Sequence, residues 1–207
     1  MNEENEDIDE IKVILIGDTG VGKTNLINTC VGLEFEEGNR PTVSGSFLEK
    51  IIEIKGKKYS LNLWDTAGQE AYRGVTKLFF KGAQIIVLVY DITNYESFKS
   101  LDEWINISQE IIDNYCIYGI VGNKNDLFLN FEVKEEEARS FAEEKNFKFK
   151  IVSAKTDPQR FSEFLIDLVK VYKRIDINKK KNSVKLNINK NDDNGKKNCI
   201  GCISNKA

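Results

Sequence analysis

Apolar positions along the chain form short runs that alternate with longer stretches of helical spacing. The runs predict strands at 11–16, 47–54, 59–64, 84–90, 117–121 and 149–152. Apolar residues three or four positions apart predict a helix beginning near residue 22 and others at 70–81, 95–114, 134–145 and 159–175. This alternation predicts an α/β fold, a mostly parallel six-stranded sheet with helices on both faces and ligands at the carboxyl ends of the strands.

The second and third runs are joined at Lys55, Gly56 and Lys57, which predicts a hairpin. With 207 residues, the chain is long enough for one domain with a full core. We expect this domain over 11–175, an acidic extension over 1–10, and a solvated tail over 176–207, where Asn and Lys dominate and the helical period fades.

The N-terminal residues do not have the pattern of a secretory signal or of a lipidation site. Residues 1–10 are acidic, unlike a secretory signal, and Asn2 excludes N-myristoylation. No apolar run approaches the roughly 20 residues that span a bilayer. We therefore expect cytoplasmic residence.

The chain contains no histidine, which excludes Ser/His/Asp triads and histidine zinc sites. Cys30 and Cys116 fall in a predicted helix and before a predicted strand, so we expect buried, reduced thiols. The chemistry must then rest on carboxylates, amides, lysine and metal.

The segment GDTGVGKT, residues 17–24, directly follows the first predicted strand. Its glycines allow backbone N–H groups to surround an anion, and the helix that follows adds its positive end. Lys23 would neutralise the outer phosphates, and the Thr24 hydroxyl would bind magnesium. The predicted nucleotide contacts here are Gly17, Asp18, Thr19, Gly20, Val21, Gly22, Lys23, Thr24 and Asn25. An ordinary glycine turn is the alternative.

DTAGQE, residues 65–70, follows the third predicted strand. The carboxylate of Asp65 can hold magnesium through water, and the Gly68 N–H can meet a terminal phosphate. Gln69 would lie beside a hydrolytic water.

NKND at 123–126 and SAK at 153–155 also follow strands. Asp126 can accept hydrogen bonds from the N1–H and exocyclic amine of guanine, a pair of donors that adenine lacks, while the Ala154 N–H can donate to the guanine carbonyl. Lys124 and Lys155 would flank the base. Each motif alone could be a turn or a helix start, but their shared position at strand ends favours a guanine-nucleotide site. The predicted base contacts are Asn123, Lys124, Asp126, Ser153, Ala154 and Lys155.

Together these motifs resemble those of Ras-superfamily small GTPases over residues 11–175, and of the Rab branch in particular. The resemblance implies a P-loop NTPase G domain. Thr42 matches the threonine of the first switch, which ligates magnesium and touches the terminal phosphate, and Phe35 matches the aromatic that packs on the base. Rab likeness rests on Trp64 and on FFKGA, LVYDIT and NYESFKSLDEW at 79–83, 88–93 and 94–104.

The resemblance also implies a surface for effectors. Phe47, Trp64 and Phe79 match the aromatic triad that Rab effectors contact, although all three could equally be core residues. It implies an exchange factor, a GTPase-activating protein, effectors and a prenylation escort or GDI as partners. We expect a monomer without a nucleic-acid partner.

The chain departs from the Rab pattern in both switches. Ser44 lengthens the usual Thr-Ile-Gly segment, Asn39 replaces a common tyrosine, and 71–73 read Ala-Tyr-Arg where Arg-Phe-Arg is frequent. These changes bear on effector identity and on closure over the phosphates. Arg40 lies near Thr42, but a built-in arginine finger would need a defined placement.

Cys199 and Cys202 resemble the paired cysteines that carry lipid at Rab tails, with unusual spacing. Two lipid chains beside basic residues are what stable membrane anchoring requires. The alternative is a pair of unmodified thiols, since a zinc site would need more ligands.

The resulting hypothesis is a Mg²⁺-dependent GTP/GDP switch in vesicle trafficking that cycles to the cytosolic face of an endomembrane or the plasma membrane. The predicted catalytic residues are Gln69, Lys23 and Thr42, and the predicted metal ligands are Thr24, Thr42 and Asp65. Turnover should be slow, on the order of once per hour. A P-loop nucleotide kinase and a non-hydrolysing binding module are the alternatives.

Overall fold

The computed structural model describes residues 8–38, 42, 46–66, 79–112 and 115–193, with side chains as far as residue 175. Contacts between Cα atoms divide the chain into two units, Met1–Tyr172 and Lys173–Ala207. The first unit holds the sheet and is described first.

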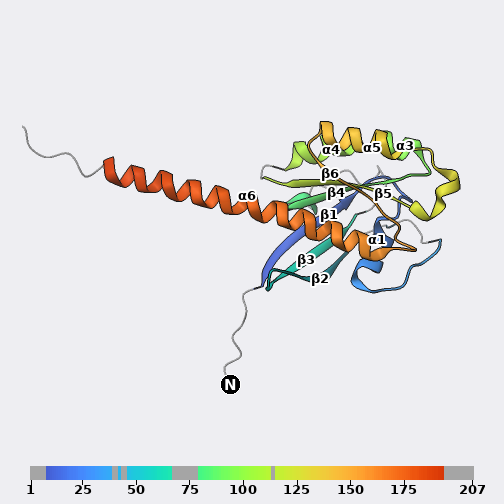
Figure 1. Cartoon of the computed structure of the whole chain (residues 1–207), viewed down its shortest axis with the longest axis horizontal. Helices are drawn as coiled ribbons and strands as arrows, with labels where there is room; N and C mark the ends of the chain where they lie inside the picture. The colour runs from blue at the N-terminus through green and yellow to red at the C-terminus, as the bar shows by residue number, and fades with distance from the viewer. Residues whose placement is uncertain (1–7, 39–41, 43–45, 67–78, 113–114, 194–207) are drawn as a thin grey trace, which may run out of the picture. The chain divides into compact units, whose positions relative to one another are not determined.

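Six strands form one sheet in the order β2-β3-β1-β4-β5-β6 (Figure 1). β2 runs antiparallel to β3, and the other neighbouring pairs are parallel. This confirms the predicted fold class. The strands are β1 (Asp9–Ile16), β2 (Ser46–Ile54), β3 (Lys57–Asp65), β4 (Ile85–Asp91), β5 (Ile117–Asn123) and β6 (Lys148–Ile151).

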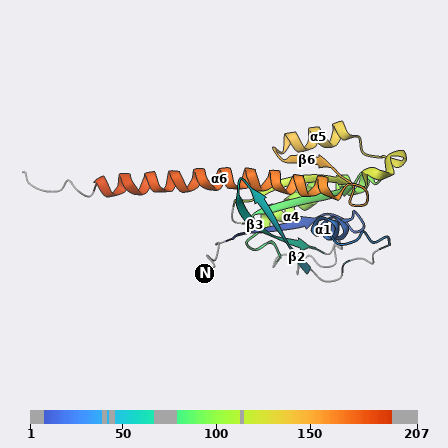
Figure 2. The ribbon, with the colours of Figure 1, turned by 60° about the horizontal axis from the view of Figure 1, so that its bottom comes forward.

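Helices cover both faces of the sheet (Figures 1 and 2). α1 (Lys23–Val31) contacts β2 and β3, and lies beside the start of α6 (Pro158–Asp193), where Cys30 Sγ is 3.3 Å from Ser162 Oγ. On the other face, α3 (Tyr95–Lys99) and α4 (Leu101–Ile111) contact β4, and α5 (Glu135–Glu144) contacts β5 and β6. A short 3₁₀ segment, η2 (Asn125–Asn130), follows β5.

The core explains the uninterrupted apolar runs. Every residue of β4 is buried, as expected for a central strand with helices on both sides. On the α3–α4–α5 face, Leu88 and Ile120 of the sheet pack in one cluster with Phe98 and Leu101. Phe161 and Leu165 of α6 are fully buried as well.

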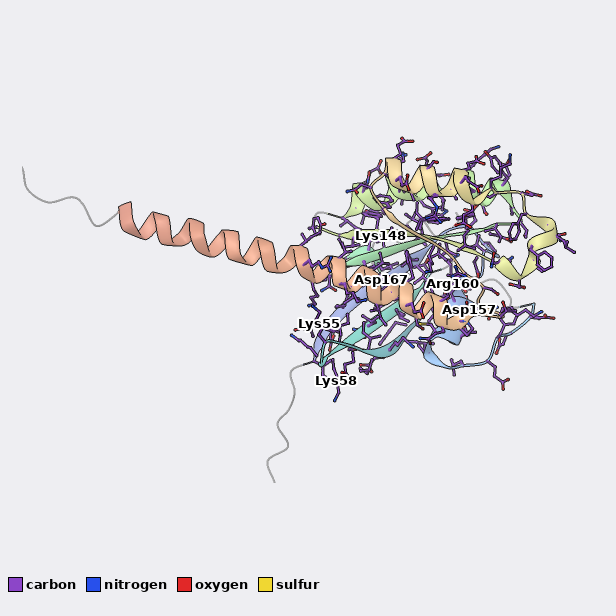
Figure 3. The ribbon with its side chains drawn as sticks, viewed as in Figure 1. Lys55, Lys58, Lys148, Asp157, Arg160 and Asp167 are labelled. Carbon is purple, nitrogen blue, oxygen red and sulfur yellow. The ribbon has the colours of Figure 1, made fainter. Side chains whose placement is uncertain are left out.

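Local chemistry sets the element ends. At the β2–β3 turn, Lys55 and Gly56 have φ of 54° and 77°, so the hairpin turns through left-handed backbone (Figure 3). At the start of α6, Asp157 Oδ1 accepts the Arg160 N–H at 3.2 Å and Pro158 opens the helix. Figure 3 shows Asp157 and Arg160 together at that end of the helix.

Three sequence predictions in the first unit differ from the structure or lie mostly outside it. The helix predicted over 95–114 is divided at Ser100, whose Oγ donates to Glu96 O at 3.0 Å and competes with the helical ladder. The helix predicted over 70–81 lies mostly outside the described residues. Cys30 is buried as predicted, whereas Cys116 is half-buried; both are free thiols.

In the second unit, α6 continues from Lys173 to Asp193, so its predicted end at residue 175 is wrong. The physical reason is that no glycine or proline interrupts 176–193, and the first glycine after α6 is Gly195. Lysine favours helix even where the apolar period has faded. The acidic residues 1–7 and the end of the tail, 194–207, lie outside the described residues.

Candidate functional site

A cavity of about 430 Å³ opens where the carboxyl ends of β1 and β5 meet the start of α1. This is where a parallel α/β sheet is expected to bind a ligand. The cavity is lined by Thr19, Gly20, Gly22, Lys23, Thr24, Asn25, Phe35, Glu36, Glu37, Gly38, Thr42, Thr66, Asn123, Lys124, Asp126, Leu127, Ala154 and Lys155.

The loop of residues 17–24, here called the P-loop, requires glycine for two separate reasons. A Cβ on Gly17 would lie 2.1 Å from the Val89 carbonyl oxygen, so no larger residue fits against β4. Gly22 precedes α1 with φ 97°, a left-handed conformation. The first turn of α1 carries no carboxylate, which leaves its positive end available to an anion.

Lys23 lies buried against the loop. Its Nζ donates to the carbonyl oxygens of Gly17 and Asp18, each at 2.8 Å. Burial lowers the pKa of Lys23 to about 8, although the nearby carboxylates of Asp65 and Asp18 oppose that shift. The ammonium group is therefore held inside the loop, largely charged at neutral pH.

Three oxygen-bearing side chains converge beside Lys23. Thr24 Oγ1 donates to Asp65 Oδ2 at 2.7 Å and is 3.0 Å from Thr42 Oγ1, which in turn donates to Asp65 Oδ2 at 3.3 Å. Burial raises the pKa of the Asp65 carboxyl, and the hydrogen bond from Thr24 and the charge of Lys23 oppose the rise.

This set fits a hard divalent cation. Two hydroxyls and a carboxylate are the ligand types that Mg²⁺ binds. Asp65 Oδ1 is buried and has no hydrogen-bond partner among the described residues, an arrangement that a cation or its bound water would satisfy.

At the opposite end of the cavity, Asn123 joins the P-loop to the loop that follows β6. Its Nδ2 donates to Val21 O at 2.9 Å, and its Oδ1 accepts the Ala154 N–H at 3.1 Å. The Ala154 N–H, predicted to donate to guanine, is therefore engaged with Asn123 here. Asp126 Oδ1 accepts from Ser153 Oγ at 2.5 Å, which fixes its carboxylate at the cavity wall.

Two lysines flank this end of the cavity. Lys124 has φ 71° and pairs with Asp91 Oδ2 at 2.6 Å. Lys155 Nζ lies 5.8 Å from the Phe35 ring centroid and donates to Glu37 Oε1 at 2.5 Å. The loop after α1 and the loop after β6 are thereby joined across the cavity.

The P-loop is also tied to α4. Trp104 Nε1 donates to Asp18 Oδ1 at 2.8 Å, and the Trp104 ring is buried. Asp18 lies in the 17–24 motif and Trp104 in the 94–104 segment, but no sequence pattern predicted the hydrogen bond between them.

The three aromatics of the predicted effector surface lie together. The Phe47 and Trp64 rings stack with centroids 5.2 Å apart, and Phe79 lies 5.6 Å from Trp64. Phe47 is exposed and the other two are half-buried, so none belongs to the buried core. Lys12 Nζ lies 4.3 Å from the centroid of Trp64.

Most predicted contacts line the cavity, and five of the described ones do not: Gly17, Asp18, Val21, Asp65 and Ser153. These five support the lining residues through the contacts given above. Gly68, Gln69, Asn39, Arg40, Ser44, residues 71–73, Cys199 and Cys202 lie outside the described residues.

The sequence prediction missed five lining residues, Glu36, Glu37, Gly38, Thr66 and Leu127. The pair of hydrogen bonds between Asn25 and the backbone of Glu36 places the 36–38 segment at the cavity. Thr66 and Leu127 directly follow the predicted Asp65 and Asp126, so their place in the sequence, next to a predicted contact, is the signal that could have identified them.

The comparisons with known proteins agree with this geometry. The family model described as Ras family matches residues 12–174. Ras-related protein Rab-11C of Dictyostelium discoideum is 39% identical over 160 residues, covering 76% of this chain and 71% of its own length. Ras-related protein Rab-30 of Homo sapiens, like that of Bos taurus, is 38% identical over 164 residues, covering 79% of this chain and 80% of its own length.

Within the described part of the chain, no helix combines the length and the apolar character needed to cross a membrane. Ras-family GTPases use GTP and GDP. The chain therefore belongs to the Ras family and is a Rab-like small GTPase, an enzyme that hydrolyses GTP and acts in membrane trafficking.

Proposed function

We propose that this chain binds GTP with Mg²⁺ in the cavity and hydrolyses it slowly, with the described residues divided between holding the phosphates and holding the base. The observation that carries the proposal is the convergence of Thr24, Thr42 and Asp65 within 3.3 Å beside the buried Lys23. No ordinary turn needs two hydroxyls, a carboxylate and an ammonium group at one strand end.

Each residue has a role that follows from its position. Lys23 and the N–H groups of 17–24 stabilise negative charge on the outer phosphates. Thr24, Thr42 and Asp65 would hold Mg²⁺, which supplies neutralising charge between the phosphates. Gln69 orients the attacking water, as the family resemblance implies.

The switch follows from the role of Thr42. This residue lies in the loop before β2, and its hydroxyl contacts both Thr24 and Asp65. Loss of the terminal phosphate would release Thr42 and the Gly68 N–H, so both switch segments would change conformation. Exchange factors, GTPase-activating proteins and effectors would act on these two states, with effectors reading the Phe47–Trp64–Phe79 surface.

A single-turnover assay tests the catalytic role. The wild-type chain, loaded with GTP and Mg²⁺, should hydrolyse on the order of one GTP per hour. Gln69→Leu should lower this rate at least tenfold while leaving GTP affinity unchanged. Gln109→Leu, at an exposed position in α4, is the matched control and should keep the wild-type rate. Equal rates in the wild type and Gln69→Leu would overturn the role of Gln69.

We also propose that Cys199 and Cys202 carry lipid and hold the switch on a membrane surface. Two chains next to the lysines of 179–197 supply the two signals that stable anchoring requires. Mass spectrometry of the C-terminal peptide from native cells should find both thiols modified. Unmodified thiols would remove the anchoring proposal and leave the nucleotide chemistry intact.

A further inference from the structure

An apolar patch on the surface lies next to the nucleotide cavity and shares Leu127 with its lining. Leu127, Phe128, Leu129 and Phe131 form this 127–131 patch, with 42%, 67%, 86% and 46% of their surfaces exposed. Single exposed apolar residues are common, whereas four within five positions mark an interaction site. The patch occupies η2 and the residue after it, at the right-hand end of the sheet in Figures 1 and 2.

The backbone holds this segment firmly on both sides. The Asn125 N–H donates to Val152 O at 3.1 Å, and the Leu127 N–H donates to Lys124 O at 2.9 Å. After the patch, the Glu132 N–H donates to Ile92 O at 2.9 Å. The exposed side chains are therefore displayed on an anchored segment.

The core position that follows the patch is filled by Val133 and not by a patch residue. Val133 is buried and its N–H donates to Ile92 O at 3.2 Å, so it occupies the core position next to the segment. Displaying Phe128 and Leu129 to water gives the isolated domain no stability. A bound partner would bury them.

The surroundings of the patch are strongly acidic. Residues 125–144 contain seven carboxylates against two cations, Lys134 and Arg139, a formal charge of −5 where the whole chain has −3. Glu135, Glu136 and Glu137 form the exposed first turn of α5. Their position at a helix N-terminus is favourable by itself, and it also places three negative charges within six positions of Phe131.

The negative charge close to the 127–131 patch distinguishes among three kinds of binding partner. An anionic cytoplasmic membrane leaflet would be repelled. A second copy of the same face would bring two acidic surfaces together. A helix with one apolar face and lysine or arginine on its flanks complements both the apolar side chains and the carboxylates.

We propose that the 127–131 patch, set beside the acidic first turn of α5, docks a basic amphipathic helix of a partner protein. This goes beyond the GTPase activity and does not depend on it, since Phe128, Leu129 and Phe131 do not line the nucleotide cavity. Phe128 and Leu129 are the anchors, and Glu135 and Glu136 orient the helix.

A binding titration tests the proposal with the full chain in its GDP form. The probe is a synthetic 18-residue helix with leucine at i, i+3, i+4 and i+7 spacing and lysine on the other faces. The same helix with glutamate in place of lysine is its charge-reversed twin. The lysine helix should bind with a micromolar Kd, and the glutamate twin should not bind.

Variants of the chain then locate the binding. The double variant Phe128→Ser/Leu129→Ser should weaken the lysine helix about a hundredfold, because each buried anchor contributes about tenfold. Glu135→Lys/Glu136→Lys should weaken it at least tenfold and admit the glutamate twin. Ile51→Ser is the matched control: Ile51 is 50% exposed on β2 at the opposite edge of the sheet, and its loss should change nothing. Each variant should retain bound GDP, which shows that it is folded.

Four results would overturn the proposal. The first is failure of the wild-type chain to bind the lysine helix, and the second is equal binding by Phe128→Ser/Leu129→Ser. Patch-dependent binding to phosphatidylserine vesicles would identify a membrane as the occupant. A concentration-dependent dimer that Phe128→Ser/Leu129→Ser abolishes would identify a second copy.

Discussion

Replacing Gly22 with alanine tests the contact that joins the phosphate end of the cavity to the base end. Gly22 has φ 97°, and a Cβ on it would lie 2.4 Å from Asn123 Nδ2. That amide bonds to Val21 O at 2.9 Å, and its oxygen accepts the Ala154 N–H at 3.1 Å. An alanine at position 22 would therefore push the Asn123 side chain away from both partners.

Gly32 provides a matched control for backbone strain. It caps α1 with φ 95°, almost the same backbone as Gly22, and a Cβ there would meet no described atom within 4 Å. Gly32→Ala should cost only left-handed strain, about 1–2 kcal/mol. Gly22→Ala should cost the same strain plus two hydrogen bonds at about 1 kcal/mol each. The expected difference in unfolding free energy is about 2 kcal/mol.

Urea unfolding at one fixed excess of GDP and Mg²⁺ measures this difference. The rate of GDP dissociation from Gly22→Ala should also be about thirtyfold higher than from the wild type, which is the equivalent of about 2 kcal/mol. The rate from Gly32→Ala should equal that of the wild type. In an Asn123→Ala background, the excess cost of Gly22→Ala should vanish. Equal losses of unfolding free energy in the two single alanine variants would refute the reasoning.

Three other predictions follow from side chains that are buried or half-buried. Tyr90→Phe should raise the unfolding free energy by about 1 kcal/mol in urea melts, because the buried Tyr90 hydroxyl has no partner among the described residues; a loss of stability would reveal one. Burial raises the pKa of Cys116 to about 12, so at pH 8 the native chain should alkylate there about a thousandfold more slowly than a thiol of pKa 9; a matching rate would contradict the burial. Trp104→Phe should lower the unfolding free energy by about 1.5 kcal/mol, since Asp18 loses its indole donor; an unchanged melt would show that the bond contributes nothing.

The sheet could be predicted from the sequence because β4 is a nearly continuous apolar run and β2 and β3 alternate apolar with polar residues, patterns that can be recognised without long-range information. β4 is buried throughout, and its sequence, Ile85–Asp91, has that character by itself. The division of helix 95–114 at Ser100 and the extension of α6 to Asp193 could not be predicted in this way. The first depends on one side-chain hydrogen bond, and the second on helix propensity without an apolar period.

The candidate site also has a part that could be predicted from the sequence and a part that could not. Motif residues such as Lys23, Asp65 and Asp126 are recognisable because the proposed contacts to phosphate, metal and base each demand one chemical type close to a strand end. The contacts that join motifs, Trp104 to Asp18 and Lys155 to Glu37, link segments 86 and 118 positions apart and need the fold to be known. The 127–131 patch was missed for another reason: an apolar run looks the same in sequence whether it is buried or displayed.

Base selectivity tests the account most directly, because it depends on Asp126 at the cavity wall. GDP and ADP are titrated separately against the nucleotide-free chain with Mg²⁺, by competition with one fluorescent guanine nucleotide. GDP should bind at least about a thousandfold tighter than ADP, since adenine would leave the Asp126 carboxylate without its two donors. Equal affinities, or tighter binding of ADP, would contradict the account.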